Sequence, residues 1–193
     1  MPTHLRRSDA PGRVHFWTIS CFHRLGFFWD DSVKQVAIDG LKRIREKHGI
    51  CLVGYVIMPD HVHVLLYPHR RADPKPVPIS SLLRDFKQHV GYYGKERLRD
   101  YWRAHRSLWS RPLNDWAAGK LGAQDFWNTR GYDFDIDRHD TLLEKVEYCH
   151  NNPVKRGLVA IRADWKWSSF RFFDLKDESL LAMDWRGEYP LSW

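Results

Sequence analysis

The sequence lacks several features that would mark other classes of protein. No apolar run approaches the ~20 residues needed to span a bilayer, so a membrane protein is not expected. The basic residues near the start are not followed by an apolar segment, which argues against a secretory signal and predicts a cytoplasmic location. The three cysteines have no C-x-x-C spacing, which argues against a disulfide framework or a zinc knuckle. The pattern G-x-x-x-x-G-K-[ST] is missing too, so no nucleotide cofactor is expected.

The composition that remains is typical of one basic, aromatic-rich domain. The chain has 193 residues, of which 43% are apolar, enough for a single hydrophobic core. Thirty-one Lys and Arg against 24 Asp and Glu give a formal net charge of +7, which favours a polyanionic partner. Ten Trp and eight Tyr add flat side chains on which unpaired bases can stack, although much of this aromatic content must form the core. The balance favours a protein that binds single-stranded nucleic acid.

The order of the predicted elements indicates an α+β fold. Strand patterns cover residues 14–20, 51–57 and 61–67, with a short final strand at 158–161. Helix patterns run from Ser32 to Gly49, from Ser80 or Ser81 to about Leu98, and from Thr141 to Asn152, where Pro153 is expected to stop the helix. Residues 1–12 and 70–78 read as a basic arm and an extended loop, and 100–131 show no clean period. This order predicts a ferredoxin-like, split βαβ antiparallel sheet with its helices packed on one face.

His61-Val62-His63 is the sharpest local feature. Alternation along a strand places both imidazoles on one face, where they can bind one divalent metal, and Asp60 can accept an imidazole N–H beside them. The spacing also arises by chance in strands, so two exposed histidines without a ligand role are an equal alternative. A metal site needs a third ligand from elsewhere.

The last predicted helix offers that ligand together with a phenol. Tyr148 and Asn152 are four residues apart and share one flank of the helix, and an amide oxygen is a hard ligand suited to Mg²⁺ or Mn²⁺. By themselves, a flank tyrosine is more often a packing residue, and an asparagine before proline more often ends a helix. A functional role for Tyr148 and Asn152 therefore requires that the fold brings them close to the two histidines.

Four longer motifs occur in order along the chain. They are Met58-Pro59-Asp60-His61-Val62-His63-Val64-Leu65-Leu66, Phe126-Trp127-x-x-x-Gly131-Tyr132, Tyr148-Cys149-His150-Asn151-Asn152-Pro153-Val154-Lys155-Arg156-Gly157-Leu158-Val159 and Trp165-Lys166-Trp167-Ser168-Ser169. Together they resemble the REP-associated tyrosine transposases, where REP denotes a repetitive extragenic palindrome. These proteins are relatives of the IS200/IS605 single-strand transposases within the HUH (His-hydrophobic-His) endonuclease superfamily. The resemblance runs from about Val14 to Phe170, and it predicts one domain over residues 1–174 with a C-terminal tail over 175–193.

The resemblance implies an enzyme and assigns its residues. His61, His63 and Asn152 would bind Mg²⁺ or Mn²⁺, and Tyr148 would be the nucleophile that forms a 5′-phosphotyrosine link and frees a 3′-OH. The implied substrate is single-stranded DNA that carries a REP-type hairpin, cleaved and rejoined without ATP. Members of this family lean towards monomers, while their insertion-sequence relatives dimerise, so a monomer is expected and a dimer stays open.

Four cations are candidate DNA contacts, each with a simple alternative as a solvated surface charge: Arg84, Lys87, Lys155 and Arg156. A non-catalytic module that binds single-stranded nucleic acid on the same ferredoxin-like scaffold is the alternative function, although no RNP1-like run supports it. A small metallohydrolase, in which water replaces the tyrosine, is a third hypothesis.

Overall fold

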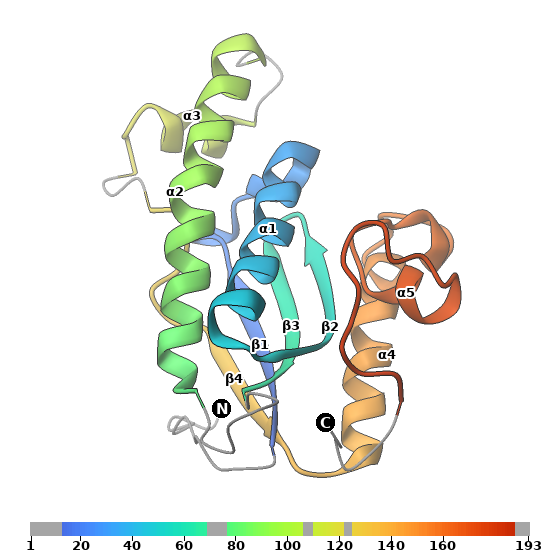
Figure 1. The fold of residues 1–193 in the computed structure, drawn as a ribbon. Coiled ribbons are helices and arrows are strands. Elements are labelled where there is room, and N and C mark those ends of the chain that lie inside the picture. The colour runs from blue at the N-terminus through green and yellow to red at the C-terminus, as the bar shows by residue number, and fades with distance from the viewer. Residues whose placement is uncertain (1–12, 69–76, 106–109, 122–124, 188–193) are drawn as a thin grey trace, which may run out of the picture.

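The computed structural model describes residues 13–68, 77–105, 110–121 and 125–187. The predicted basic arm and most of the predicted proline-rich loop lie outside these residues. A four-stranded antiparallel sheet occupies the centre, with strand order β2-β3-β1-β4 (Figure 1). Its strands are β1 (Val14–Ser20), β2 (Cys51–Met58), β3 (His61–Tyr67) and β4 (Tyr132–Ile136). This is the strand order of the split βαβ pattern, and the predicted α+β antiparallel architecture is confirmed.

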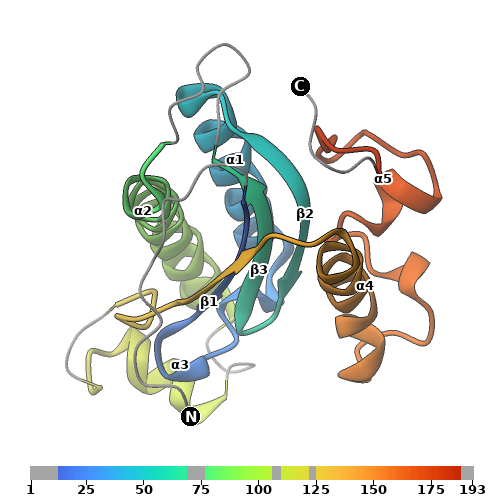
Figure 2. The ribbon, with the colours of Figure 1, turned by 90° about the horizontal axis from the view of Figure 1, so that it is seen from below.

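Helices cover the two faces of the sheet unequally. The α helices are α1 (Asp31–His48), α2 (Ile79–His105), α3 (Arg111–Ala117), α4 (His139–Lys155) and α5 (Phe170–Asp174), and short 3-10 turns are η1 (Phe22–Arg24), η2 (Phe27–Trp29) and η4 (Arg162–Asp164). Figure 2 shows α1 and α2 on one side of the sheet and α4 on the other. The expectation that all helices share one face is therefore corrected for α4. The helices α1 and α2 connect strands of the sheet and must cross on the same side, whereas α4 follows the last strand and is free of that constraint.

The helix ends follow local signals, with two corrections. Asp30 is the N-cap of α1 and accepts a hydrogen bond from the Ser32 backbone N–H at 2.8 Å, so the cap begins two residues before the predicted capping box. Pro153 does not stop α4, which continues to Lys155. The stop is Gly157 at φ 66°, whose N–H donates to the Val154 carbonyl while the next N–H donates to the Pro153 carbonyl. A proline in the last turn is tolerated because only one helical N–H is lost.

The fourth strand lies elsewhere than predicted. Residues 158–161 form no strand, and β4 begins directly after the stretch 100–131 that shows no clean period. Its sequence Tyr132-Asp133-Phe134-Asp135-Ile136 alternates between aromatic or apolar and acidic residues, which is the two-residue period of a strand. Neighbouring tryptophans of that stretch belong to the core, since Trp116 and Trp127 are buried.

The outer edge of β2 is covered by the C-terminal part of the chain. The Ile57 backbone N–H donates to the Trp167 carbonyl at 2.9 Å, and Leu52 exchanges hydrogen bonds with Asp184, whose backbone N–H donates and whose carboxylate accepts. Leu181, Met183 and Trp185 are buried, so the described part of the predicted tail packs against the core. This covering leaves no free strand edge at β2. Among the described helices, none is both long and apolar enough to cross a membrane.

Candidate active site

The two histidines of β3 meet on the face of the sheet that α4 covers. His61 and His63 are both buried, and their Nε2 atoms lie 3.0 Å apart with the rings nearly perpendicular. The strand places them there because residues two apart share a face. The rings lean towards each other, which brings the two nitrogens much closer than the backbone spacing of ~7 Å.

Each imidazole is oriented by a partner at its other nitrogen. Nδ1 of His61 lies 2.6 Å from the Asp60 carboxylate, as the sequence predicts, and Nδ1 of His63 lies 2.9 Å from the Thr18 hydroxyl on β1. When both rings carry their proton at Nδ1, their two Nε2 lone pairs converge on one point. Such outer partners fix the tautomer of metal-binding histidines.

The surroundings of the pair favour a neutral His63 imidazole and an ionised Asp60 carboxylate. Burial and the neighbouring His61 lower the pKa of His63 to about 3, so its ring is neutral at ordinary pH. Burial alone would raise the pKa of Asp60, but the hydrogen bond with His61 and the positive charges of Arg24 and Arg156 hold that pKa below its usual value. The ring of His63 is thus in the form that a metal requires.

The donor set fits a divalent cation. Neighbouring corners of an octahedron with metal–ligand bonds of ~2.1 Å lie ~3 Å apart, which is the separation of the two Nε2 atoms. Two imidazoles with an amide or carboxylate oxygen form a mixed nitrogen and oxygen donor set, which suits Mn²⁺ better than Mg²⁺. The buried, converging nitrogens are therefore a plausible cation site in chemical terms.

Tyr148 comes to this pair from α4. Its ring centroid lies 5.2 Å from that of His63 and 6.0 Å from that of Phe16, both in edge-on contacts, and Phe16 stacks on His63 at 5.2 Å. The side chain is 39% exposed, so the phenol borders the solvent while the histidines beneath it do not. A phenol placed in this way is open to a group that approaches from the solvent.

Asn152 lies one helical turn after Tyr148 and is buried, with 4% of its surface exposed. A helix repeats every 3.6 residues, so the amide is on the same flank as the phenol. Its predicted role as the third metal ligand stays a prediction.

Three cations surround the site. The Lys155 amino group lies 5.9 Å from the Tyr148 ring centroid, and Arg156 is close enough to lower the pKa of Asp60. Arg24, in η1, contacts the Asp60 carboxylate at 3.1 Å. The sequence does not predict this contact, because a short irregular turn has no periodic pattern that indicates where its side chains point. Both arginines line a hollow of about 250 Å³ beside the turn between β2 and β3, together with the exposed Trp29.

The other two predicted DNA contacts lie on α2, across the sheet from Tyr148 (Figure 2). Arg84 is exposed there. The Lys87 amino group donates to the Asn128 carbonyl at 2.8 Å, which ties α2 to the segment before β4. The structure thus groups Lys155 and Arg156 with the site and separates Arg84 and Lys87 from it.

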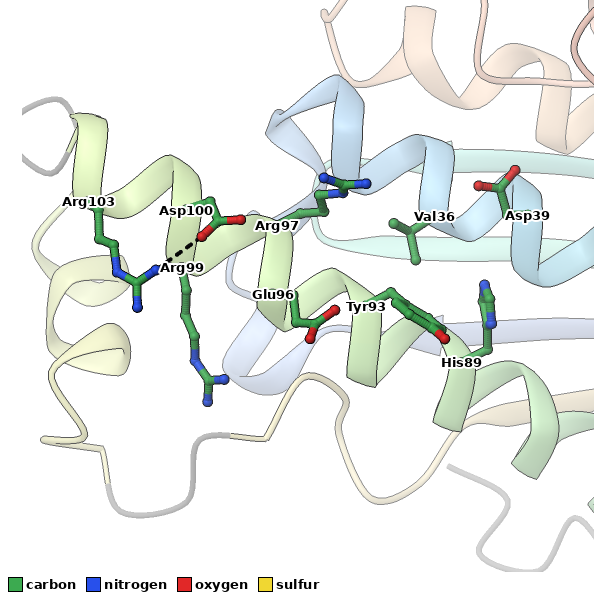
Figure 3. Close-up of a pocket in the computed structure, with 9 residues that line it drawn as sticks. All are labelled: Val36, Asp39, His89, Tyr93, Glu96, Arg97, Arg99, Asp100 and Arg103. Carbon is green, nitrogen blue, oxygen red and sulfur yellow. Dashed lines mark hydrogen bonds and ion pairs between the residues drawn. The ribbon is translucent and has the colours of Figure 1, made fainter.

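A larger hollow of about 720 Å³ lies between α1 and α2 (Figure 3). These helices are on the side of the sheet opposite α4, which carries Tyr148 (Figure 2). Three carboxylates face three guanidinium groups around it, so its charges balance and give phosphate no clear preference. These groups are Asp39, Glu96, Asp100, Arg97, Arg99 and Arg103.

The chain matches no protein-family model. Over 186 residues it is 25% identical to the "Putative REP-associated tyrosine transposase" of Haemophilus influenzae, covering 96% of this chain and 94% of that protein. The solved structure of a REP-associated tyrosine transposase bound to a REP hairpin is 19% identical, with a TM-score of 0.64, over 99% of this chain and 94% of the other. The relative confirms the resemblance drawn from the motifs, and the solved structure confirms the fold.

Proposed function

We propose that this chain, a relative of the REP-associated tyrosine transposases over nearly its whole length, is a metal-dependent transposase that cleaves and rejoins single-stranded DNA at REP-type hairpins. One observation carries the proposal: a phenol from α4 packs at 5.2 Å on one member of an imidazole pair whose Nε2 atoms converge at 3.0 Å. The residues are 85 positions apart in sequence, and the pattern combines a nucleophile with a cation site.

In the proposed reaction the Tyr148 oxygen attacks the scissile phosphorus in line. A bond forms between phosphorus and the tyrosine oxygen, the bond to the 3′ oxygen breaks, and that oxygen leaves as a hydroxyl after taking up a proton. Tyr148 gives up one proton in the same step. One phosphodiester replaces another, so the reverse attack by a 3′-OH rejoins DNA without ATP.

His61 and His63, with Asn152 as a third ligand, would hold Mg²⁺ or Mn²⁺. Such an ion, when bound, polarises the phosphate and orients it for attack. The ionised Asp60 carboxylate, at 2.6 Å, can only accept and so holds the proton of His61 at Nδ1, and the Thr18 hydroxyl, at 2.9 Å, can accept the corresponding proton of His63.

The surroundings of Tyr148 suit an extended single strand. Lys155 and Arg156 lie where they can neutralise phosphates next to the scissile bond, and Arg24 widens this basic rim. Tyr132 is 45% exposed and stacks on Phe134, on the same face of the sheet as Phe16, so it offers a platform for an unpaired base. The solved structure of a similar protein, a REP-associated tyrosine transposase bound to a REP hairpin, supports hairpin DNA as the partner.

The test uses a hairpin oligonucleotide with a single-stranded 5′ extension and a label at its 3′ end, which a 5′-phosphotyrosine link retains, incubated with Mn²⁺. We expect the native chain to cleave it and to retain label through denaturation, and Tyr148→Phe to bind the hairpin without forming the adduct. Tyr92→Phe is a matched control, because that exposed tyrosine lies on α2 across the sheet and should cleave normally. Cleavage without an adduct would indicate a hydrolase, and binding without cleavage would indicate a non-catalytic module. Either result would overturn the proposal.

A further inference from the structure

A second group of metal-ligating side chains lies on the opposite face of the sheet. His15 on β1 is paired directly with Asp135 on β4, and Asp133 comes two residues before it on the same face. His15 Nδ1 is 3.1 Å from Asp133 Oδ1 and 3.3 Å from Asp135 Oδ1. Because Phe16 faces Tyr148, the alternation of the strand turns His15 towards the side of α1 and α2. The two groups are therefore separated by the sheet.

The distances in this cluster differ from those of the other histidine–carboxylate contacts. His48 meets Asp85 at 2.8 Å and His61 meets Asp60 at 2.6 Å, within or just below the ~2.7–2.9 Å of a charge-assisted hydrogen bond. At His15 both contacts are longer, and a single N–H cannot point along a straight line at two oxygens. Ligands around one ion with bonds of ~2.1 Å lie ~3.0–3.4 Å apart, depending on geometry. The spacing of His15 to its two carboxylates falls in that interval.

One carboxylate of the cluster is buried and incompletely satisfied. The Asp133 side chain is only 5% exposed and faces His15, and within the described part of the chain neither its buried Oδ2 atom nor the buried Nε2 atom of His15 has a hydrogen-bond partner. Arg13, at 3.7 Å, approaches Asp135 rather than Asp133. A buried carboxylate without full compensation is costly, so a positive charge is needed between the three side chains. Asp135 is 16% exposed, which leaves a route from the solvent.

We propose that His15, Asp133 and Asp135 form a second divalent-metal site, distinct from the His61 and His63 pair. One imidazole nitrogen with two carboxylate oxygens suits Mn²⁺ or Zn²⁺ better than Mg²⁺, which prefers an all-oxygen shell. No catalytic role follows, because Tyr148 lies on the other face. The ion would join the edge strand β4 to β1 across 118 residues of sequence. It would lie next to Phe16 in β1, whose ring contacts Tyr148 on the other face of the sheet.

The test counts bound Mn²⁺ on the full chain, with excess Mg²⁺ present to occupy all-oxygen sites. The variant His61→Ala/His63→Ala removes the candidate catalytic site and should still bind one Mn²⁺, with the ¹⁴N coupling of a single imidazole in pulsed electron paramagnetic resonance. Adding Asp133→Asn to that variant should abolish the binding. Asp140→Asn, which changes a carboxylate that is 84% exposed, is the matched control and should leave it intact.

The outcomes separate this inference from the proposed function. No Mn²⁺ on His61→Ala/His63→Ala would mean that the contacts of His15 with the two carboxylates hold the cluster without an ion, and would overturn the second site. Binding that persists after Asp133→Asn would overturn it as well. If circular dichroism shows that Asp133→Asn does not fold, the partly exposed Asp135→Asn takes its place with the same expectation. A third result is that the native chain binds one Mn²⁺ and that Asp133→Asn alone abolishes this binding. It would support the second site and contradict the metal dependence proposed for the reaction of Tyr148.

Discussion

Replacing Ser169 with alanine tests how α4 is held against the sheet. Ser169 follows the Trp165-Lys166-Trp167 run at the outer edge of β2 and is buried. Its hydroxyl oxygen accepts a hydrogen bond from the Tyr55 backbone N–H at 3.0 Å and lies 3.0 Å from His150 Nε2 on α4. One side chain thus links the strand edge to the helix that carries Tyr148.

The expected loss of stability is about 3 kcal/mol. Alanine leaves a buried backbone N–H and a buried imidazole nitrogen without their partner, and each such loss costs ~1–3 kcal/mol. The removed oxygen is too small to leave room for a replacing water, since a water needs a cavity of at least one ~1.4 Å probe sphere with several polar partners. We therefore expect the denaturation midpoint in urea to fall at an unchanged slope.

Ser168→Ala is the internal comparison. Its hydroxyl is also buried but accepts a single, longer hydrogen bond, at 3.3 Å from the Phe170 N–H, so we expect a loss of about 1 kcal/mol. A Ser169→Ala variant no less stable than Ser168→Ala would refute the assignment of Ser169 as the link. If the link positions Tyr148, Ser169→Ala should also lower cleavage more than hairpin binding.

Three further predictions concern pH, metal and DNA. Burial lowers the pKa of His150 from 6.5 to about 4, so the unfolded chain takes up the proton first, and this residue should account for a loss of about 3 kcal/mol of stability as the pH falls from about 6.5 to 4. Urea unfolding at several pH values should show a slope that is smaller by this amount in His150→Gln, while the slope that His63 contributes through its own lowered pKa stays. Thr18→Val removes the partner of His63 Nδ1 and should weaken Mn²⁺ binding ~10–100-fold in calorimetry without unfolding the chain, and unchanged affinity would contradict the role of Thr18. Tyr132→Ala should cost ~1–3 kcal/mol of affinity for a single-stranded extension, measured by fluorescence anisotropy, while a blunt hairpin should bind as before.

The sequence allows the histidine pair to be predicted because its geometry is local. Alternation along a strand places His61 and His63 on one face whatever the rest of the fold does, and Asp60 is next to them. The approach of Tyr148 depends on the face that α4 covers, which is a tertiary property that no local pattern contains. Only the joint occurrence of the motifs indicated it.

Other features could not be predicted for different reasons. Arg24 reaches Asp60 from a 3-10 turn that has no periodic signal. The period-two pattern of β4 was present in the sequence, but it is five residues long and follows a stretch dominated by Trp and Arg, so the strand was missed. The cluster around His15 could not be predicted either, because Asp133 and Asp135 come next to His15 only through the pairing of β4 with β1.

Peptide mapping of the protein–DNA adduct tests the central claim most directly. After reaction of the native chain with a hairpin oligonucleotide, digestion with protease and nuclease should leave one modified peptide, with a nucleotide joined through its 5′ phosphate to Tyr148. The other DNA fragment should end in a free 3′-OH. A nucleotide on another residue, or a 3′-phosphate link, would contradict the account of this site.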